Sequence, residues 1–160
     1  TAGTSGAVGE LVNASFETGN TTGWTVAPAE ALVAKHVYVQ WPAGGSSVPD
    51  GNYELSTWHQ TAAFATEISQ TVTGLEDGTY TFKAYFTRGD GFNEVSLFAR
   101  NCGGAEVTPE TIPLTDPTQW LAVSLAGIEV AGGSCEVGVR VDSNPENWMN
   151  ADLFTFEKEE

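Results

Sequence analysis

The sequence predicts an all-β protein, an antiparallel β-sandwich of the jelly-roll type in a single domain. Apolar and polar residues alternate with a period of two along much of the chain, as they do in strands that bury one face. No long stretch has apolar residues at the spacing of a helix. Short clusters of Gly, Asn, Asp and Pro interrupt the alternation, as turns between consecutive strands do.

Three segments show the clearest alternation. Phe64 and Val72 lie on one face of segment 64–73, segment 78–88 has apolar residues at every second position from Tyr80, and segment 134–142 repeats valine with the same period. With weaker patterns elsewhere, the chain predicts about nine strands, enough for a two-sheet jelly roll. In chain order, the expected strands span 10–16, 31–41, 52–58, 64–73, 78–88, 93–101, 118–130, 134–142 and 149–158.

The length of 160 residues fits one domain with a substantial core. Residues 1–9 are rich in Gly, Ala, Ser and Thr, and we expect them to be the remnant of a linker, with the domain at 10–160. No apolar run is long enough to span a membrane. We expect the domain to be secreted, as part of a larger protein.

The charge of the chain restricts its partners. The formal net charge is -15, from 6 Lys and Arg against 21 Asp and Glu. Such a surface repels nucleic-acid phosphates, anionic membranes and acidic polysaccharides. A neutral ligand or a cation is therefore the expected partner.

The sequence has two cysteines, Cys102 and Cys135. They permit one disulfide in a secreted domain, or two unpaired thiols, and the sequence leaves both possibilities open. Together with the two histidines they match no zinc-binding spacing.

No motif of catalysis is present. The chain has no nucleophile elbow, no zinc-binding histidine pair and no phosphate-binding glycine loop. The sequence therefore predicts a domain that is not an enzyme. A pair of glycosidase carboxylates stays open as an alternative, because acidic residues are so numerous.

Tryptophans are the strongest indication of a binding site. Trp58 lies at a strand end among polar neighbours, Trp148 follows the loop Asn144-Pro-Glu-Asn147, and Trp41 lies at the mouth of another loop. The apolar face of a sugar ring stacks on an indole, while nearby polar groups hydrogen-bond its hydroxyls. We expect Trp58 and Trp148 to contact a carbohydrate. The alternative is that each ring plugs an end of the sandwich.

Several polar residues could complete this site. Arg88 ends a strand beside Gly-Asp-Gly-Phe92, and its guanidinium could hold sugar hydroxyls in a fixed fork. A surface salt bridge is the alternative role. The full set of expected ligand contacts is Trp58, Trp148, Arg88, His59, Asn147, Asn101 and Phe92.

A cation site is the second expectation. The alternation places Asp152 on the inward face that Phe154 and Phe156 share, where a carboxylate is costly unless it is paired or binds a metal. Ca²⁺ takes oxygen ligands of this kind. We expect a structural Ca²⁺ with Glu17, Asp50 and Asp152 as ligands; the alternative is a carboxylate held by backbone N–H groups.

Segments spread along the chain resemble one known family. They are Leu11-Val-Asn-Ala-Ser-Phe-Glu17, Gly51-Asn-Tyr-Glu-Leu-Ser-Thr-Trp58, the stretch from Ile68 to Phe82, and Asn147-Trp-Met-Asn-Ala-Asp152. From Glu10 to Glu157, the chain resembles the family 61 carbohydrate-binding modules attached to bacterial endo-β-1,4-galactanases. The stretch Ser69-Gln-Thr-Val-Thr-Gly74 is shared by several related families and indicates the fold, whereas Trp58 and Trp148 narrow the family.

The resemblance implies a β-jelly roll, a structural Ca²⁺ and binding of β-1,4-galactan on a loop-built face that includes Trp58 and Trp148. One position departs from the family pattern, which often has two successive acids in the closing segment. Here Leu153 follows Asp152, so the role of the second acid stays open.

The expected function is to bind neutral plant cell-wall polysaccharide, most of all β-1,4-galactan, and so to target an appended glycoside hydrolase to its polymer. Three alternatives stay open. The module could bind another neutral glycan such as xylan or β-glucan, it could be a structural or adhesion sandwich with Trp58 and Trp148 buried, or it could be a small lyase or hydrolase.

Overall fold

The computed structural model describes residues 9–27, 37–40, 48–59, 61–115 and 119–159. Over these residues the chain forms strands and turns without a helix. The strands are β1 (Thr25–Ala27), β2 (Val37–Gln40), β3 (Glu54–Trp58), β4 (Phe64–Thr73), β5 (Gly78–Arg88), β6 (Phe92–Arg100), β7 (Glu110–Thr111), β8 (Leu121–Val130), β9 (Ser134–Ser143) and β10 (Trp148–Lys158).

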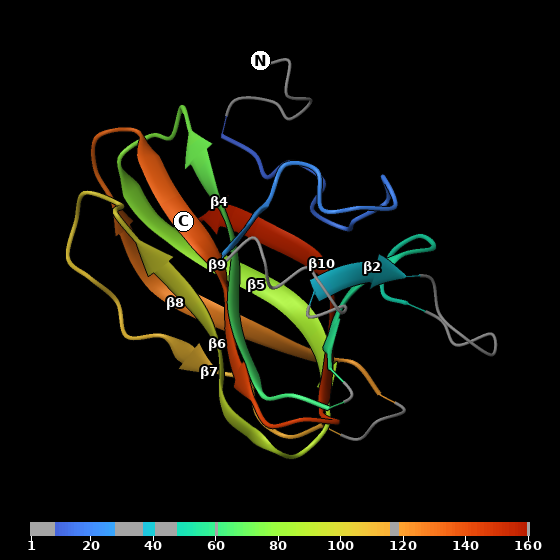
Figure 1. The fold of residues 1–160 in the computed structure, drawn as a ribbon. Coiled ribbons are helices and arrows are strands. Elements are labelled where there is room, and N and C mark those ends of the chain that lie inside the picture. Colours follow the sequence, from blue (N-terminus) through green and yellow to red (C-terminus); the bar gives the residue numbers. More distant parts are fainter. Residues whose placement is uncertain (1–8, 28–36, 41–47, 60, 116–118, 160) are drawn as a thin grey trace.

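Two five-stranded antiparallel sheets make a sandwich, which confirms the predicted fold class (Figure 1). Sheet A has the strand order β1-β4-β9-β6-β7, and sheet B has the order β2-β3-β10-β5-β8. Neighbours in each sheet are mostly distant in sequence, so the pairings bring remote segments of the chain together.

The core lies between the two sheets. Sheet B contributes Phe82, Phe86 and Phe154, and sheet A contributes Val137 and Val139, all of them buried. These side chains occupy alternate positions on their strands, which is why the period-two pattern predicted the bounds of β4 and β5 to the residue and those of β6, β9 and β10 to within one.

The expected strand at 10–16 is wrong. Residues 11–24 form turns, and two left-handed residues three positions apart, Asn13 at φ 52° and Phe16 at φ 59°, break the extended conformation that a strand needs. The apolar residues of this segment plug one side of the core instead. The Phe16 ring lies 5.4 Å from that of Trp24 and 5.8 Å from that of Phe154.

The other expected strands agree in part with the structure. Segment 31–41 includes β2, while residues 28–36 and 41–47, and with them Trp41, lie outside the described residues. Segment 118–130 begins late, at Leu121. The short strands β1 and β7 were not predicted, because two or three largely exposed residues carry no alternation to detect.

Cys102 and Cys135 form a disulfide, which decides between the two possibilities that the sequence left open. Cys102 follows β6 and Cys135 lies in the neighbouring strand β9, so the bridge ties one end of sheet A together. No helix in the described part of the chain is long and apolar enough to cross a membrane.

Candidate ligand-binding site

Trp58 and Trp148 are direct neighbours in sheet B. They are paired in the antiparallel register of β3 and β10. Residues opposed in this way lie on the same face of a sheet, with Cβ atoms about 4.5–5.5 Å apart. Met149, the next residue, is fully buried, so the two tryptophans lie on the outer face of the sheet. Both are partly exposed, so neither is sealed beneath the loops.

Three chain connections meet at this end of the sandwich (Figure 1). The Glu146 N–H donates to the His59 carbonyl at 2.8 Å, and the Asn144 N–H donates to the Gly91 carbonyl at 3.3 Å. The β3–β4, β5–β6 and β9–β10 connections are thereby joined. The structure therefore brings together most of the expected ligand contacts: Trp58, His59, Arg88, Phe92, Asn147 and Trp148.

Arg88 is engaged with the loops of this end. It pairs with the buried Met149, which directs its side chain toward the space between the sheets. Its Nε donates to the Ile112 carbonyl and its Nη1 to the Gly89 carbonyl, each at 3.0 Å, and its guanidinium lies 5.7 Å from the centre of the Phe92 ring. In the structure it holds the loops beside the tryptophans.

Asn147 and His59 also shape the loops. The Asn147 amide donates to the carbonyls of Asn144, Pro145 and Gly91 at 3.0, 3.1 and 3.4 Å. The His59 Nδ1 accepts the N–H groups at positions 61 and 62, at 3.2 and 3.0 Å. These contacts fix the backbone on both sides of the Trp58–Trp148 pair.

Asn101 is the expected contact that the structure does not bring to this site. It follows the last residue of β6, whereas Phe92 begins that strand, so the strand separates them by roughly 30 Å. Its amide donates to Glu136 Oε1 at 3.4 Å. The sequence placed Asn101 near a strand end but held no information about which end of the sandwich that would be.

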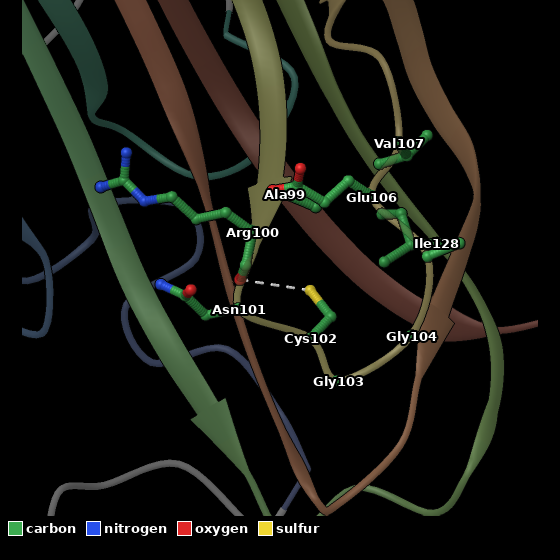
Figure 2. A pocket seen from close by; sticks show the side chains of 10 residues that line it. Ala99, Arg100, Asn101, Cys102, Gly103, Gly104, Glu106, Val107 and Ile128 are labelled. Carbon is green, nitrogen blue, oxygen red and sulfur yellow. Dashed lines mark hydrogen bonds between the residues drawn. The ribbon is translucent and has the colours of Figure 1, made fainter.

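A small hollow lies at that far end, beside the disulfide (Figure 2). Its volume is about 190 Å³. Arg100 and Asn101 point to one side of the end of β6, while Glu106, Val107 and Ile128 lie on the other. It contains no expected contact apart from Asn101.

Sequence reasoning missed a polar row next to the tryptophans. Ser56, Asn150 and Thr87 are aligned across β3, β10 and β5, two residues along from the Trp58–Trp148 pair and on the same face. The Ser56 hydroxyl donates to Asn150 Oδ1 at 2.7 Å, and Asn150 Nδ2 lies 3.4 Å from Thr87 Oγ1. The sequence could have indicated this row, because Asn150 lies two residues after Trp148 in an alternating strand and therefore on the same face.

The Asp152 carboxylate is fully buried, as expected, though for another geometric reason. β10 has a bulge between Asp152 and Thr155, with Leu153 at φ 52°, so the alternation with Phe154 and Phe156 is interrupted. Asp152 pairs with Tyr85, while its neighbour Ala151 pairs with the buried Phe86. Asp152 therefore leaves the core face, and the segments before β1 and β3 cover it.

The surroundings of the Asp152 carboxylate suit a bound cation. Its Oδ2 accepts the Asp50 N–H at 3.0 Å, while its buried Oδ1 has no hydrogen-bond partner among the described residues. Burial raises the pKa of Asp152 to about 7, and the charges of Asp50 and Glu17 act in the same direction, against the hydrogen bonds from the Asp50 and Leu153 N–H groups. A cation would satisfy the free oxygen and neutralise this acidic surrounding.

Glu17 lies against the turn that begins with Asp50. Its Oε1 and Oε2 accept the N–H groups of Asn52 and Tyr53 at 2.8 and 2.9 Å. A side chain at Gly51 would displace the Glu17 carboxylate, and the φ of 67° at this residue also favours glycine. In the described residues, no three Asp, Glu, His or Cys side chains converge as a complete metal site. Asp152 fits a cation best, because one of its oxygens is both buried and free.

Several solved structures similar to this chain are carbohydrate-binding modules. TmCBM61 in complex with β-1,4-galactotriose is 26% identical, with a TM-score of 0.80 over 93% of this chain and 97% of that chain. The CBM22-1 xylan-binding domain of Paenibacillus barcinonensis Xyn10C is 18% identical, with a TM-score of 0.53 over 90% of each chain. A family 16 carbohydrate-binding module is 14% identical, with a TM-score of 0.63 over 92% of this chain and 99% of that chain. No protein-family model and no curated protein sequence matches the chain.

The fold and its similarity to TmCBM61 define a class of protein: this chain is a non-catalytic carbohydrate-binding module of the β-sandwich type. Within that class, the resemblance to family 61 is confirmed by the match to TmCBM61 over nearly the whole of both chains. The two other structures are less than 25% identical and support the fold alone.

Proposed function

We propose that this module binds β-1,4-linked galactan through the Trp58–Trp148 pair and so holds an appended glycoside hydrolase on plant cell-wall polysaccharide. The observation that carries the proposal is the direct pairing of two partly exposed tryptophans on the outer face of sheet B. TmCBM61, similar over almost its whole length, is bound to β-1,4-galactotriose, which favours galactan among neutral glycans.

The chemistry of the site suits a neutral sugar. An indole face takes the apolar face of a pyranose, and the half-buried Asn150 lies two residues from Trp148 to hydrogen-bond hydroxyls. The net charge of -15 repels anionic polymers, whereas a neutral galactan meets no electrostatic repulsion. Arg88 and Asn147 contribute mainly by holding the loops that flank the rings.

The test is isothermal titration with β-1,4-galactotriose of the Trp58→Ala and Trp148→Ala variants. Each should weaken binding at least tenfold, because truncating a central aromatic contact costs about 2 kcal/mol. Asn101→Gly is the matched control: it removes an amide at the far end, tolerates the local φ of 57°, and should leave affinity unchanged. Wild-type affinity in both tryptophan variants would place the site elsewhere, and a glycan array would identify xylan or β-glucan if galactan is not bound.

A structural Ca²⁺ belongs to the same proposal. Asp152 would hold it through the free Oδ1, and Asp50 and Glu17 would add negative charge beside it. When bound, the ion supplies charge compensation that fixes the segments around residues 17 and 50 against β10. This part of the fold lies next to the sheet that carries the tryptophans.

We also propose that the module works outside the cell. The disulfide between Cys102 and Cys135 supports this, because such bridges persist in oxidising compartments.

A further inference from the structure

Gly89 lies directly beside Trp148 in sheet B. Arg88, the last residue of β5, pairs with Met149, and one step further the Gly89 N–H donates to the Trp148 carbonyl at 2.8 Å. Gly89 is therefore opposite Trp148 on the outer face, on the side away from Trp58.

The Trp148 indole covers the place where a side chain at residue 89 would be. A Cβ built on Gly89 would lie 2.9 Å from Nε1 of the indole and 3.3 Å from both Cδ1 and Cε2, the two ring atoms that flank it. An approach in the plane of the ring, along the N–H bond, would leave these two atoms clearly farther away than Nε1. The near-equal distances instead place the Cβ position over the face of the ring, so one indole face lies on the Gly89 backbone.

The backbone of Gly89 itself does not require glycine. Its φ is not among the positive values in the structure, whereas Gly91, two residues on, has φ 139°. The requirement at residue 89 is therefore space for the indole and not a left-handed conformation. Because the three atoms nearest to the built Cβ all belong to Trp148, a methyl group added at Gly89 reports first on that ring.

We propose that Gly89 is a positioning residue for the binding site: its missing side chain lets the Trp148 indole lie flat on the backbone, with its other face presented to the sugar. The inference rests on the proposed function and adds to it the reason for the orientation of the ring. The competing role is structural, because an aromatic ring across from a strand glycine also stabilises the sheet.

The test compares Gly89→Ala with Asp90→Ala, an exposed neighbour in the same turn. Each variant is titrated with β-1,4-galactotriose and examined without sugar by near-ultraviolet circular dichroism and thermal unfolding. We expect Gly89→Ala to weaken binding about tenfold and to change the tryptophan dichroism, because the methyl group must displace the ring. Asp90→Ala should change neither.

The Trp148→Ala background separates positioning from a structural role. There, adding Gly89→Ala should change neither affinity nor the dichroism further, since the overlapping ring is absent. Wild-type affinity and dichroism in Gly89→Ala, or an equal additional loss in the Trp148→Ala background, would overturn the inference. If Gly89→Ala alone does not fold, the double variant should fold because the overlap is gone, and its failure to fold would also overturn the inference.

The outcome is distinguishable from failure of the proposed function. If Trp148→Ala itself retains full affinity, the sugar site is misplaced, but the dichroism of the sugar-free protein still decides whether Gly89 positions the ring. If Trp148→Ala loses affinity and Gly89→Ala does not, the proposed function stands and the positioning role falls.

Discussion

At the scale of single residues, buried Asp152 is the most unusual group in the described part of the chain. One oxygen of its carboxylate has no partner, and acidic neighbours face it from two other segments. We expect added Ca²⁺ to raise the melting temperature of the wild-type module by several degrees and a chelator to reverse the rise, because a ligand that binds only the folded state stabilises it.

Asp152→Asn is the matched variant for this experiment, since it keeps the shape and removes the charge. Differential scanning calorimetry with and without Ca²⁺ should show no rise in its melting temperature. An equal rise in the variant and the wild type would place the ion elsewhere.

At the scale of elements, the outer face of sheet A is held by a network of ion pairs. Arg100 binds Glu136 at 2.9 Å and Glu67 at 3.0 Å, and Arg140 binds Glu67 at 2.8 Å. The two guanidinium groups cover the Phe98 ring at 4.6 and 4.9 Å, which leaves this outward residue only 2% exposed. The network joins β4, β9 and β6, on the sheet opposite to the tryptophans.

This network should make the sheet sensitive to acid. The hydrogen bond from Arg100 holds the pKa of Glu136 below its ordinary value of 4.5, against the opposing effect of burial. A carboxylate with a lowered pKa stabilises the fold above its unfolded pKa, and this stability is lost as the pH falls through the folded value. The melting temperature should therefore fall as the pH drops below about 4.5, and less steeply in Glu136→Gln. Identical slopes for the two proteins would show that the ion pair contributes nothing measurable.

At the scale of the whole molecule, the two ends of the sandwich have different roles. The disulfide ties one end, where Cys102 and Cys135 are 33 residues apart in sequence, and the tryptophans occupy the other. Closing a loop of this size stabilises a fold by about 3–4 kcal/mol. The Cys102→Ser, Cys135→Ser double variant should lose roughly this free energy of unfolding in urea and keep wild-type affinity for galactotriose, because β9 separates the bridge from the site. A large loss of affinity in the folded variant would mean that the two ends are coupled.

The sequence alone was enough to predict the sandwich and its central strands. Segments such as 64–73 and 78–88 bury every second side chain, and this alternation is a local property that needs no knowledge of the partner strand. The polar neighbours and loop-end positions of Trp58 and Trp148 also predicted that these rings are not core residues like Trp24, and both are partly exposed in the structure; their contact with a sugar stays a prediction.

Tertiary structure alone decided which residues meet. The pairing of Trp58 with Trp148 joins segments 90 positions apart in the sequence. Asn101 lies at the opposite end of the sandwich because of the direction in which β6 runs. The space above Gly89 and the bulge that turns Asp152 out of the core face arise from strand register. The alternation of apolar and polar residues shows which face of a strand is buried. It does not show the register or the direction of the neighbouring strands, and these decide which residues lie together at the candidate site.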